Sequence, residues 1–294
     1  MSALLVSLIF GVAIPILAMA ALVPFLQHYA PHSPNFHGVE VFTGLGVAWF
    51  IWLVGLWSAQ QLLLAIKVTP PHWLLFLIPL APLLAGTCVF GLFDDWAGDR
   101  TSKGFRGHLR ALSHGRLTTG GLKFLGIGLL SLVVAFGLFY VGPATLPKTI
   151  VAALVMALSA NLINLFDLRP GRASKVYVLC LAIVLPLVIF VHAAVSVLNA
   201  WEAVALALAV LGPVFSTWRF DIKERGMLGD IGANSMGALV GYLLVLALPL
   251  WALVIVMLAL LAINLLSERY SFSRIIESVA WLRALDHLGR KEVR

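Results

Sequence analysis

Charged side chains are scarce in this sequence. Lys, Arg, Asp and Glu together make up 11% of the 294 residues, whereas a soluble domain carries about 25%. The mean hydropathy is +1.01, and several uncharged stretches reach the roughly 20 apolar residues that a helix needs to cross a bilayer. This scarcity excludes an ordinary soluble domain and predicts an integral membrane protein with helical spans.

Cysteine is rare as well. The two cysteines, Cys88 and Cys180, lie in separate apolar stretches. A disulfide framework needs several paired cysteines, and a structural zinc site needs clustered cysteine and histidine ligands. We expect neither kind of site in this protein.

A loop large enough to form a soluble domain is absent too, so we expect one membrane domain, residues 1–266, and a short tail, residues 267–294. No Lys or Arg precedes the first apolar stretch, which is also too long for a signal peptide. We therefore predict an all-α, polytopic bundle of nine to ten transmembrane helices. The expected spans are residues 3–26, 43–66, 73–93, 120–142, 149–166, 174–195, 200–217, 232–248 and 250–266.

The Lys and Arg residues behind the net charge of +7 lie mainly between the spans and in the tail. If the spans alternate in direction, eighteen of the twenty Lys and Arg residues fall on one side, and only Lys67 and Lys148 fall on the other. Positively charged loops stay in the cytoplasm, so we expect the N-terminus outside and the C-terminus inside. The basic balance thus indicates topology, not binding to nucleic acid. The cytoplasmic set is Arg100, Lys103, Arg106, Arg110, Arg116, Lys123, Arg169, Arg172, Lys175, Arg219, Lys223, Arg225, Arg269, Arg274, Arg283, Arg290, Lys291 and Arg294.

The tail carries apolar residues at helical spacing, with basic residues between them. This pattern predicts a single amphipathic helix at the membrane interface. Its apolar residues are Ile275, Ile276, Val279, Leu282 and Leu285.

Aspartates stand where three spans meet the cytoplasm. Asp94 and Asp95 end one span, Asp167 ends another and Asp230 begins a third. Ionisable groups at such depths are costly and are candidates for function, although one isolated Asp would be an ordinary helix-end residue. Asp230 can also be interpreted as the N-cap of the following helix. Asp99 lies close by in the sequence.

Small residues follow Asp230 at helical spacing and predict close packing of that helix against its neighbours. They are Gly232, Ser235, Gly237 and Gly241.

Converging carboxylates suit a hard cation, because Mg²⁺ is usually bound by one or two carboxylates together with substrate phosphates. Nearby cations can bind phosphate oxygens, Arg as a bidentate donor and Lys as a point charge. The pattern therefore favours a phosphorylated substrate at the inner membrane face. The candidate phosphate ligands are Arg169, Arg172, Lys175 and Arg225.

Three segments carry a family resemblance. "GLFDDWAGD" (residues 91–99), "NLINLFD" (161–167) and "GDIGANSMG" (229–237) resemble the cytoplasmic signatures of the polyprenyl-phosphate N-acetylhexosamine-1-phosphate transferases, in the family's order. The resemblance implies transfer of a sugar-1-phosphate from a UDP-sugar to a polyprenyl phosphate, with release of UMP and with Mg²⁺, or Mn²⁺ in its place. It also implies a multi-pass protein of the bacterial cytoplasmic membrane, a role in cell-envelope synthesis and a homodimer.

The resemblance also implies roles for individual residues. Asp94 and Asp95 match the family's aspartate pair, which serves the metal and the lipid phosphate. Asp230 matches a metal ligand, and Lys123 matches the family's lysine near the third and fourth spans. Asn161, Asn164 and Asp167 match the N-x-x-N-x-x-D signature near the diphosphate and the nucleotide.

Departures from the family leave two other interpretations open. Leu168 and Pro170 replace a Gly and an Asp of the second signature, and "NLLSERYSFSRIIES" lacks the family's histidines. The protein could instead be a catalytically weakened relative that binds polyprenyl phosphate or a lipid-linked intermediate as a partner or regulator. A transporter is the third interpretation, but it would place ionisable residues near the middle of spans, where this sequence has none.

Overall fold

The computed structural model describes residues 2–98, 107, 111, 113–139 and 145–290. Within these residues, nine helical segments are long and apolar enough to cross a membrane. The predicted all-helical membrane bundle and the predicted positions of its spans are therefore confirmed. Several charged residues named above lie outside the described residues: Asp99, Arg100, Lys103, Arg106, Arg110, Lys291 and Arg294.

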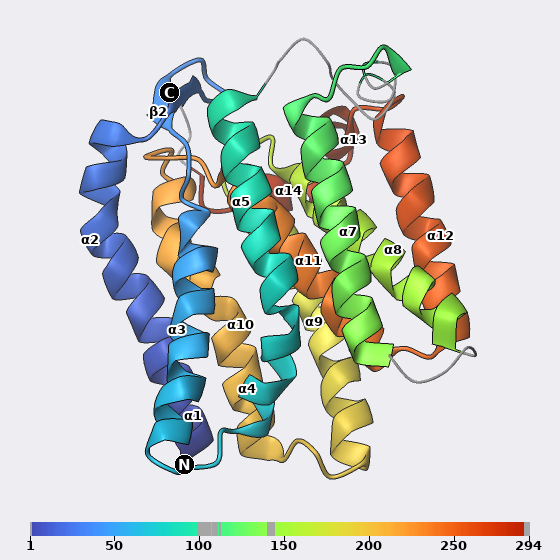
Figure 1. Cartoon of the computed structure of the whole chain (residues 1–294). Helices are drawn as coiled ribbons and strands as arrows, with labels where there is room; N and C mark the ends of the chain where they lie inside the picture. The colour runs from blue at the N-terminus through green and yellow to red at the C-terminus, as the bar shows by residue number, and fades with distance from the viewer. Residues whose placement is uncertain (1, 99–106, 108–110, 112, 140–144, 291–294) are drawn as a thin grey trace.

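The elements follow one another closely along the chain (Figure 1). In order they are α1 (Ser2–Val6), the π-helical stretch η1 (Ser7–Ala13), α2 (Ile14–Tyr29), β1 (His32–Pro34), β2 (Glu40–Phe42), α3 (Val47–Ala65), α4 (His72–Leu77), the 3₁₀ turn η2 (Ile78–Leu80), α5 (Ala81–Ala97), α7 (Thr119–Phe139), α8 (Leu146–Phe166), α9 (Arg172–Ala194), α10 (Ala200–Asp221), α11 (Gly229–Ala247), α12 (Leu250–Ser267), α13 (Phe272–Ser278) and α14 (Ala280–His287).

Helix α11 is the centre of the bundle. It packs against α8, α5, α9 and α3, and 83% of its span is buried. The predicted close packing of its small residues is confirmed, because a Cβ at Gly237 would lie only 2.0 Å from the backbone oxygen of Ser159 in α8. A Cβ at Gly241 would lie 2.7 Å from the Cα of Met156. Glycine therefore lets the α8 and α11 backbones approach each other.

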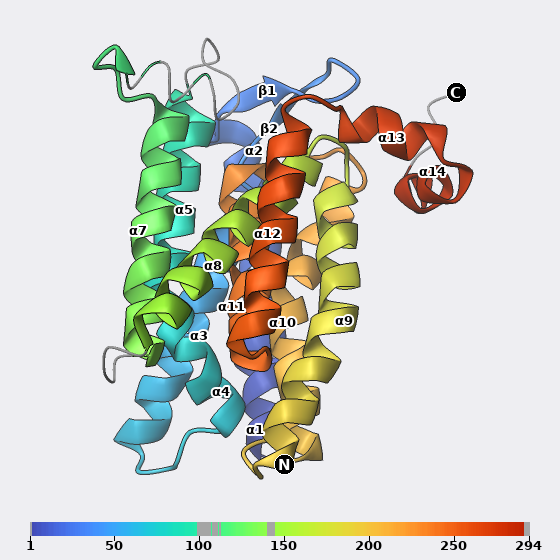
Figure 2. The ribbon, with the colours of Figure 1, turned by 90° about the vertical axis from the view of Figure 1, so that its right-hand side faces the viewer.

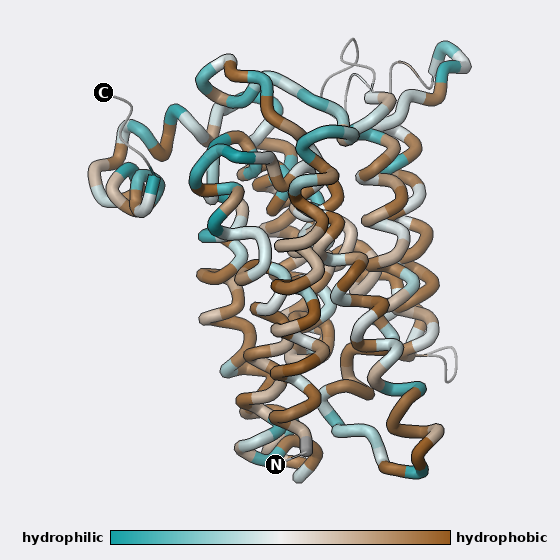
Figure 3. The backbone as a smooth tube through the Cα atoms, turned by 90° about the vertical axis from the view of Figure 1, so that its left-hand side faces the viewer, coloured by the Kyte–Doolittle hydropathy of each residue, from teal (hydrophilic) through white to brown (hydrophobic). Residues whose placement is uncertain are grey.

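The three predicted motifs lie at one end of the bundle, which we call the motif end. It contains the last residues of α5 and α8 and the first residues of α11, whereas the N-terminus lies at the opposite end (Figure 1). Apolar residues dominate the middle of the spans, and hydrophilic residues gather towards the ends (Figure 3). The chain thus brings three distant segments together, and the assignment of this end to the cytoplasm stays a prediction.

The tail differs from the single helix that the sequence predicted. Its backbone is extended at Val279 (φ −103°, ψ 114°), so α13 and α14 are separate short helices. They stand out from the bundle beside the beginning of α9 (Figure 2). Asp286 of α14 forms an ion pair with Arg172, the first residue of α9. The apolar periodicity could not reveal this long-range pair, which fixes α14 against the bundle.

Candidate functional site

A lysine joins two of the predicted aspartates at the motif end. The Nζ atom of Lys123, on α7, donates to Asp94 Oδ2 at 2.6 Å and to Asp230 Oδ2 at 2.5 Å. Asp94 also accepts a hydrogen bond from Thr119 Oγ1 at 2.7 Å. The side chain of Lys123 is only 12% exposed, so these carboxylates compensate the charge of an ammonium group largely removed from water.

Asp95 caps the central helix from another span. Its carboxylate accepts the backbone N–H groups of Asp230 at 3.0 Å and of Ile231 at 3.5 Å, both in the first turn of α11. Such groups have no partner within their own helix. The interpretation of Asp230 as the N-cap is therefore wrong. Asp95 does the capping, and the carboxylate of Asp230 stays free to bind Lys123.

Gly229 makes this cap geometrically feasible. Its φ is +72°, a left-handed conformation that strains other residues. A Cβ at this position would lie 2.5 Å from Asp95 Oδ2. Glycine at position 229 is therefore required by sterics, while Asp230 contributes the chemistry of its carboxylate.

Asp167 follows α8 and joins the same group of acids. Burial raises the pKa of the Asp167 carboxyl well above its ordinary value, and the negative charges of Asp221, Asp230 and Asp95 raise it further. The backbone N–H of Gly229 opposes this rise in pKa through a hydrogen bond. The three predicted motifs therefore interact electrostatically around the beginning of α11.

An apolar cavity of about 550 Å³ leads from this group of residues. It lies between α7, α8 and α12, where α8 crosses the bundle obliquely (Figure 2). Arg116 and Glu268 line it near the motif end, and Leu154 and Met257 line it near the middle of the spans. Its polar lining residues also include Lys123, Asn161, Asn164, Asn234 and Asn264.

Asn264 was not predicted from the sequence. Its Oδ1 accepts a hydrogen bond of 2.6 Å from Asn161 Nδ2, and its Nδ2 donates to the backbone oxygen of Leu260 at 2.8 Å. An asparagine inside a stretch of leucines and alanines is the one signal that could have identified it. Thr119, which binds Asp94, could have been found from its position four residues before Lys123.

The predicted phosphate ligands have other partners. Arg172 donates to both carboxylate oxygens of Asp286 at 2.7 Å, and each of these side chains is only 3% exposed. Lys175 donates to the backbone oxygen of Asp286 at 2.5 Å. In the structure Arg172 and Lys175 therefore bind the tail, and their role as phosphate ligands stays a prediction.

The other two predicted cations also lie away from the Lys123 group. The Arg169 guanidinium lies over the ring of Phe36, 3.4 Å from its centroid, and forms an ion pair of 3.6 Å with Glu277. Arg225 lies in the connection before α11 and is exposed. None of the four predicted phosphate cations shares the contacts of Asp94 and Asp230.

The loop after Asp167 is anchored by a residue that sequence analysis did not single out. Asp221, at the end of α10, accepts the backbone N–H of Gly171 at 3.1 Å. Gly171 has a φ of +69° and precedes the first turn of α9. This contact fixes the chain between the second motif and α9.

Carboxylate oxygens such as those of Asp94 and Asp230 are ligands that Mg²⁺ prefers, and Mg²⁺ at this site stays a prediction. One oxygen of each carboxylate points to the same position, which the Lys123 ammonium group occupies. Two carboxylates together with substrate phosphates are a usual set of Mg²⁺ ligands. Binding of the metal there requires the ammonium group to move towards another anion, such as a substrate phosphate.

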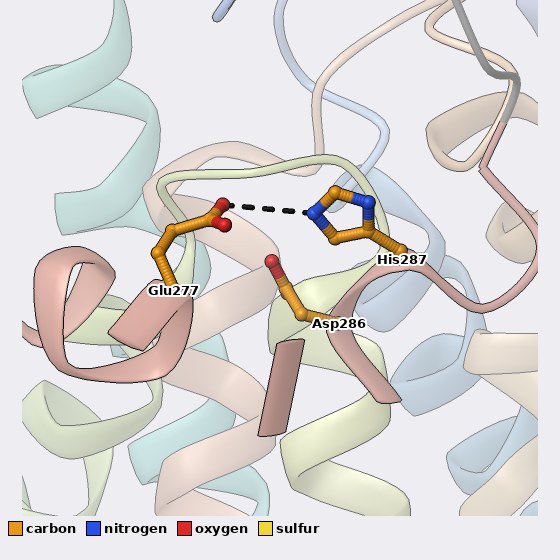
Figure 4. A group of neighbouring side chains, drawn as sticks. All are labelled: Glu277, Asp286 and His287. Atoms are coloured by element: carbon orange, nitrogen blue, oxygen red, sulfur yellow. Dashed lines mark ion pairs between the residues drawn. The ribbon is translucent and has the colours of Figure 1, made fainter. Parts of the chain in front are cut away.

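A second acidic group lies in the tail (Figure 4). Among the residues that the structure describes, only Glu277, Asp286 and His287 bring three potential metal ligands within 4.8 Å of one another. Both oxygens of Asp286 already accept from Arg172, and His287 faces Glu277 at 3.6 Å. These contacts make the group part of the attachment of the tail.

A comparison with known protein families finds no family that matches the chain, and a comparison with curated proteins finds no significant match. The function of the site therefore has to be argued from its own residues.

Proposed function

We propose that this protein transfers a sugar-1-phosphate from a UDP-sugar to a polyprenyl phosphate at the cytoplasmic face of the membrane, with release of UMP. It would be a divergent polyprenyl-phosphate N-acetylhexosamine-1-phosphate transferase of the bacterial cytoplasmic membrane. One observation carries the proposal. Lys123 lines an apolar cavity between spans, and the same Lys123 binds two aspartates from different motifs.

The cavity suits an amphiphilic phosphate. Its leucines and other apolar residues would take the part of a prenyl chain next to the phosphate, while the rest of the chain stays in the bilayer. Lys123 would bind the phosphate as a point charge, and Asn161 and Asn164, which line the same cavity, would donate hydrogen bonds. This arrangement explains why a lysine is largely removed from water within a span.

In the reaction, an oxygen of the lipid phosphate forms a bond to the phosphorus that carries the sugar, and the bond from that phosphorus to UMP breaks. Orienting the two phosphates is the main task of the protein. A proton on the lipid phosphate would pass to a carboxylate of this group, and Asp167 of the second motif is the candidate base. Asp95 would keep Asp230 in place by capping α11.

Asp94 and Asp230 would bind Mg²⁺. When bound, the ion would screen the repulsion between the two substrates. Mn²⁺ prefers the same oxygen ligands and is expected to substitute.

A second candidate function is supported by a different observation. Lys123 takes up the point where Asp94 and Asp230 converge, and Arg172 and Lys175 are bound to the tail. A protein with these contacts could bind polyprenyl phosphate, or a lipid-linked intermediate, without transferring sugar. A transporter is disfavoured, because the charged residues of the described spans lie within about a turn and a half of the helix ends.

The deciding experiment uses purified protein in nanodiscs with undecaprenyl phosphate and a panel of radiolabelled UDP-sugars, with Mg²⁺ or with EDTA. Label in the lipid fraction that requires the metal would support the transferase. No labelled lipid, together with saturable binding of undecaprenyl phosphate that Lys123→Met abolishes, would support the binding protein. Neither transfer nor binding would refute both proposals.

A further inference from the structure

Helix α14 presents an apolar face to its surroundings. Trp281 is 64% exposed, Leu285 44% and Leu288 67%. Trp281 and Leu285 are four positions apart and lie on one side of α14, and Leu288 is the C-cap residue that directly follows the helix. Asp286 is buried on the side that meets the bundle, and Arg283 and His287, both exposed, lie on a third side. The helix thus has one face for the protein, one polar face and one apolar face.

The tail is held at the height at which the spans end. Asp286 binds Arg172, the first residue of the α9 span. Arg290 donates to the backbone oxygen of Pro170 at 2.9 Å, just before the same span. On its other side, α13 begins at Phe272, soon after the α12 span ends at Ser267. Both ends of the tail are therefore fixed to the ends of membrane spans.

The surface found at this height is the lipid headgroup region. Tryptophan is enriched there, and amphipathic helices lie in that plane with their apolar face among the upper acyl chains. The exposed arginines of the tail suit anionic headgroups, which attract basic segments next to the membrane. The residues concerned are Arg269 and Arg274, whereas Arg283 lies on the polar face of α14.

We propose that α13 and α14 form a docking surface for the bilayer, in which Trp281, Leu285 and Leu288 enter the headgroup region of the inner leaflet and Arg269 and Arg274 contact anionic lipid. The bilayer is favoured over a second protein chain because the spans that fix the tail, α9 and α12, expose large apolar side chains such as Ile183 (68%) and Ile255 (60%). The proposal does not depend on the transferase activity.

The test is the depth of a spin label on full-length protein in nanodiscs of phosphatidylcholine and phosphatidylglycerol. Cys88 and Cys180 are replaced by Ser, and a nitroxide is attached at Leu285→Cys or, as the matched control one half-turn away, at Arg283→Cys. We expect the label at 285 to collide mainly with oxygen, which concentrates in the bilayer, and the label at 283 mainly with a water-soluble nickel complex. Equal access to nickel would overturn the proposal, and so would shielding of the label at 285 from both reagents, since protein would then cover this face.

A second measurement avoids cysteine substitution. The pair Trp281→Ser and Leu285→Ser removes the apolar face and should raise amide hydrogen exchange in α14 by about tenfold or more, because burial of these side chains in lipid would no longer stabilise the helix. The pair Arg283→Ser and His287→Ser should leave this exchange within about twofold of the original. Equal exchange in the two variants would contradict docking.

Discussion

A carboxylate from one helix caps another helix at each end of the bundle, and the two caps differ in their surroundings. At the end opposite the motif end, Glu202 of α10 accepts the backbone N–H groups of Trp73 at 2.9 Å and of His72 at 3.2 Å, at the beginning of α4. At the motif end, Asp95 does the same for α11. Among the described residues, Glu202 has one ion-pair partner, His72 at 3.8 Å when that ring is protonated, whereas Asp95 lies close to Asp94, Lys123, Asp167 and Asp230.

This difference distinguishes a carboxylate that only stabilises the fold from a group of carboxylates that indicates a functional site. Capping a helix across the bundle needs one carboxylate, as Glu202 demonstrates. The further acids at the motif end carry a cost of burial that the fold does not require. Residues that cost stability without serving the fold are typical of functional sites. Four predictions sharpen or break this comparison.

The largest effect is expected from removing the charge of Asp230 or Asp94. Asp230→Asn and Asp94→Asn keep the size of the side chain but weaken the ion pair with Lys123 and the binding of the proposed metal ion. We expect sugar-1-phosphate transfer to fall by about 100-fold or more in a radiolabel assay on folded protein. Glu202→Gln is the matched control and should keep full transfer. Full activity of both aspartate variants would remove the functional difference between the two ends.

The two caps themselves can be compared directly. Asp95→Ala and Glu202→Ala each leave helix N–H groups unpaired, so each should lower the free energy of unfolding by about 1–2 kcal/mol. Only Asp95→Ala should also slow transfer, because the first turn of α11 carries Asp230. Thermal unfolding and transfer per folded molecule check this pair. Equal loss of transfer in both variants would break the comparison.

A smaller effect, with the opposite sign for stability, is expected at Asp167. Its raised pKa means that ionisation costs more in the folded than in the unfolded protein. Stability therefore falls as the pH rises from about 3.9, the ordinary pKa of Asp, towards the raised value.

Asp167→Asn cannot ionise, so its melting temperature should exceed that of the original protein by a few degrees at pH 7, and the difference should vanish below about pH 4. Transfer should still be lost. A variant that is less stable at pH 7 would show that Asp167 is a structural residue.

The smallest effect is expected for attachment of the tail in mild acid. Burial acts to raise the pKa of Asp286, but the hydrogen bonds and charges of Arg172 and Arg290 outweigh it and hold this pKa below its usual range. The stabilisation is thus complete above about pH 3.9 and is lost as the pH falls through the lower, folded value. The protection of the α14 amides, which is their exchange rate relative to that of an unfolded peptide at the same pH, should be unchanged between pH 7 and pH 5.

Arg172→Met is the control for this last prediction. It removes the main partner of Asp286 and should release the tail already at pH 7. If protection of the α14 amides in the original protein fell between pH 7 and pH 5, this would contradict the lowered pKa of Asp286.

Much of the fold could be predicted, because long apolar segments admit few structures in a membrane. The positions of the spans and the tight packing of Gly237 and Gly241 follow from residue type and spacing alone. The grouping of Asp94, Asp95, Asp167 and Asp230 at one end followed from alternation of the spans.

What could not be predicted are the long-range contacts of polar side chains. Two adjacent aspartates look alike in the sequence, yet Asp94 binds Lys123 and Asp95 caps α11. Arg172 looks like a phosphate ligand until Asp286, 114 residues later, is seen to pair with it. Residue type gives the chemistry of such groups, and only the folded chain decides which partner each group finds.

The central position of α11 has a consequence for biogenesis. Its span has a mean hydropathy of 1.4, the lowest of the nine described spans, and α12 follows after two residues with 2.6. A segment this weakly apolar enters the membrane poorly alone, so α11 is expected to insert as a helical hairpin with α12. Seven spans precede it on the ribosome. The motif end is thus completed last, and a chain truncated before residue 229 would have most of the bundle but no assembled site.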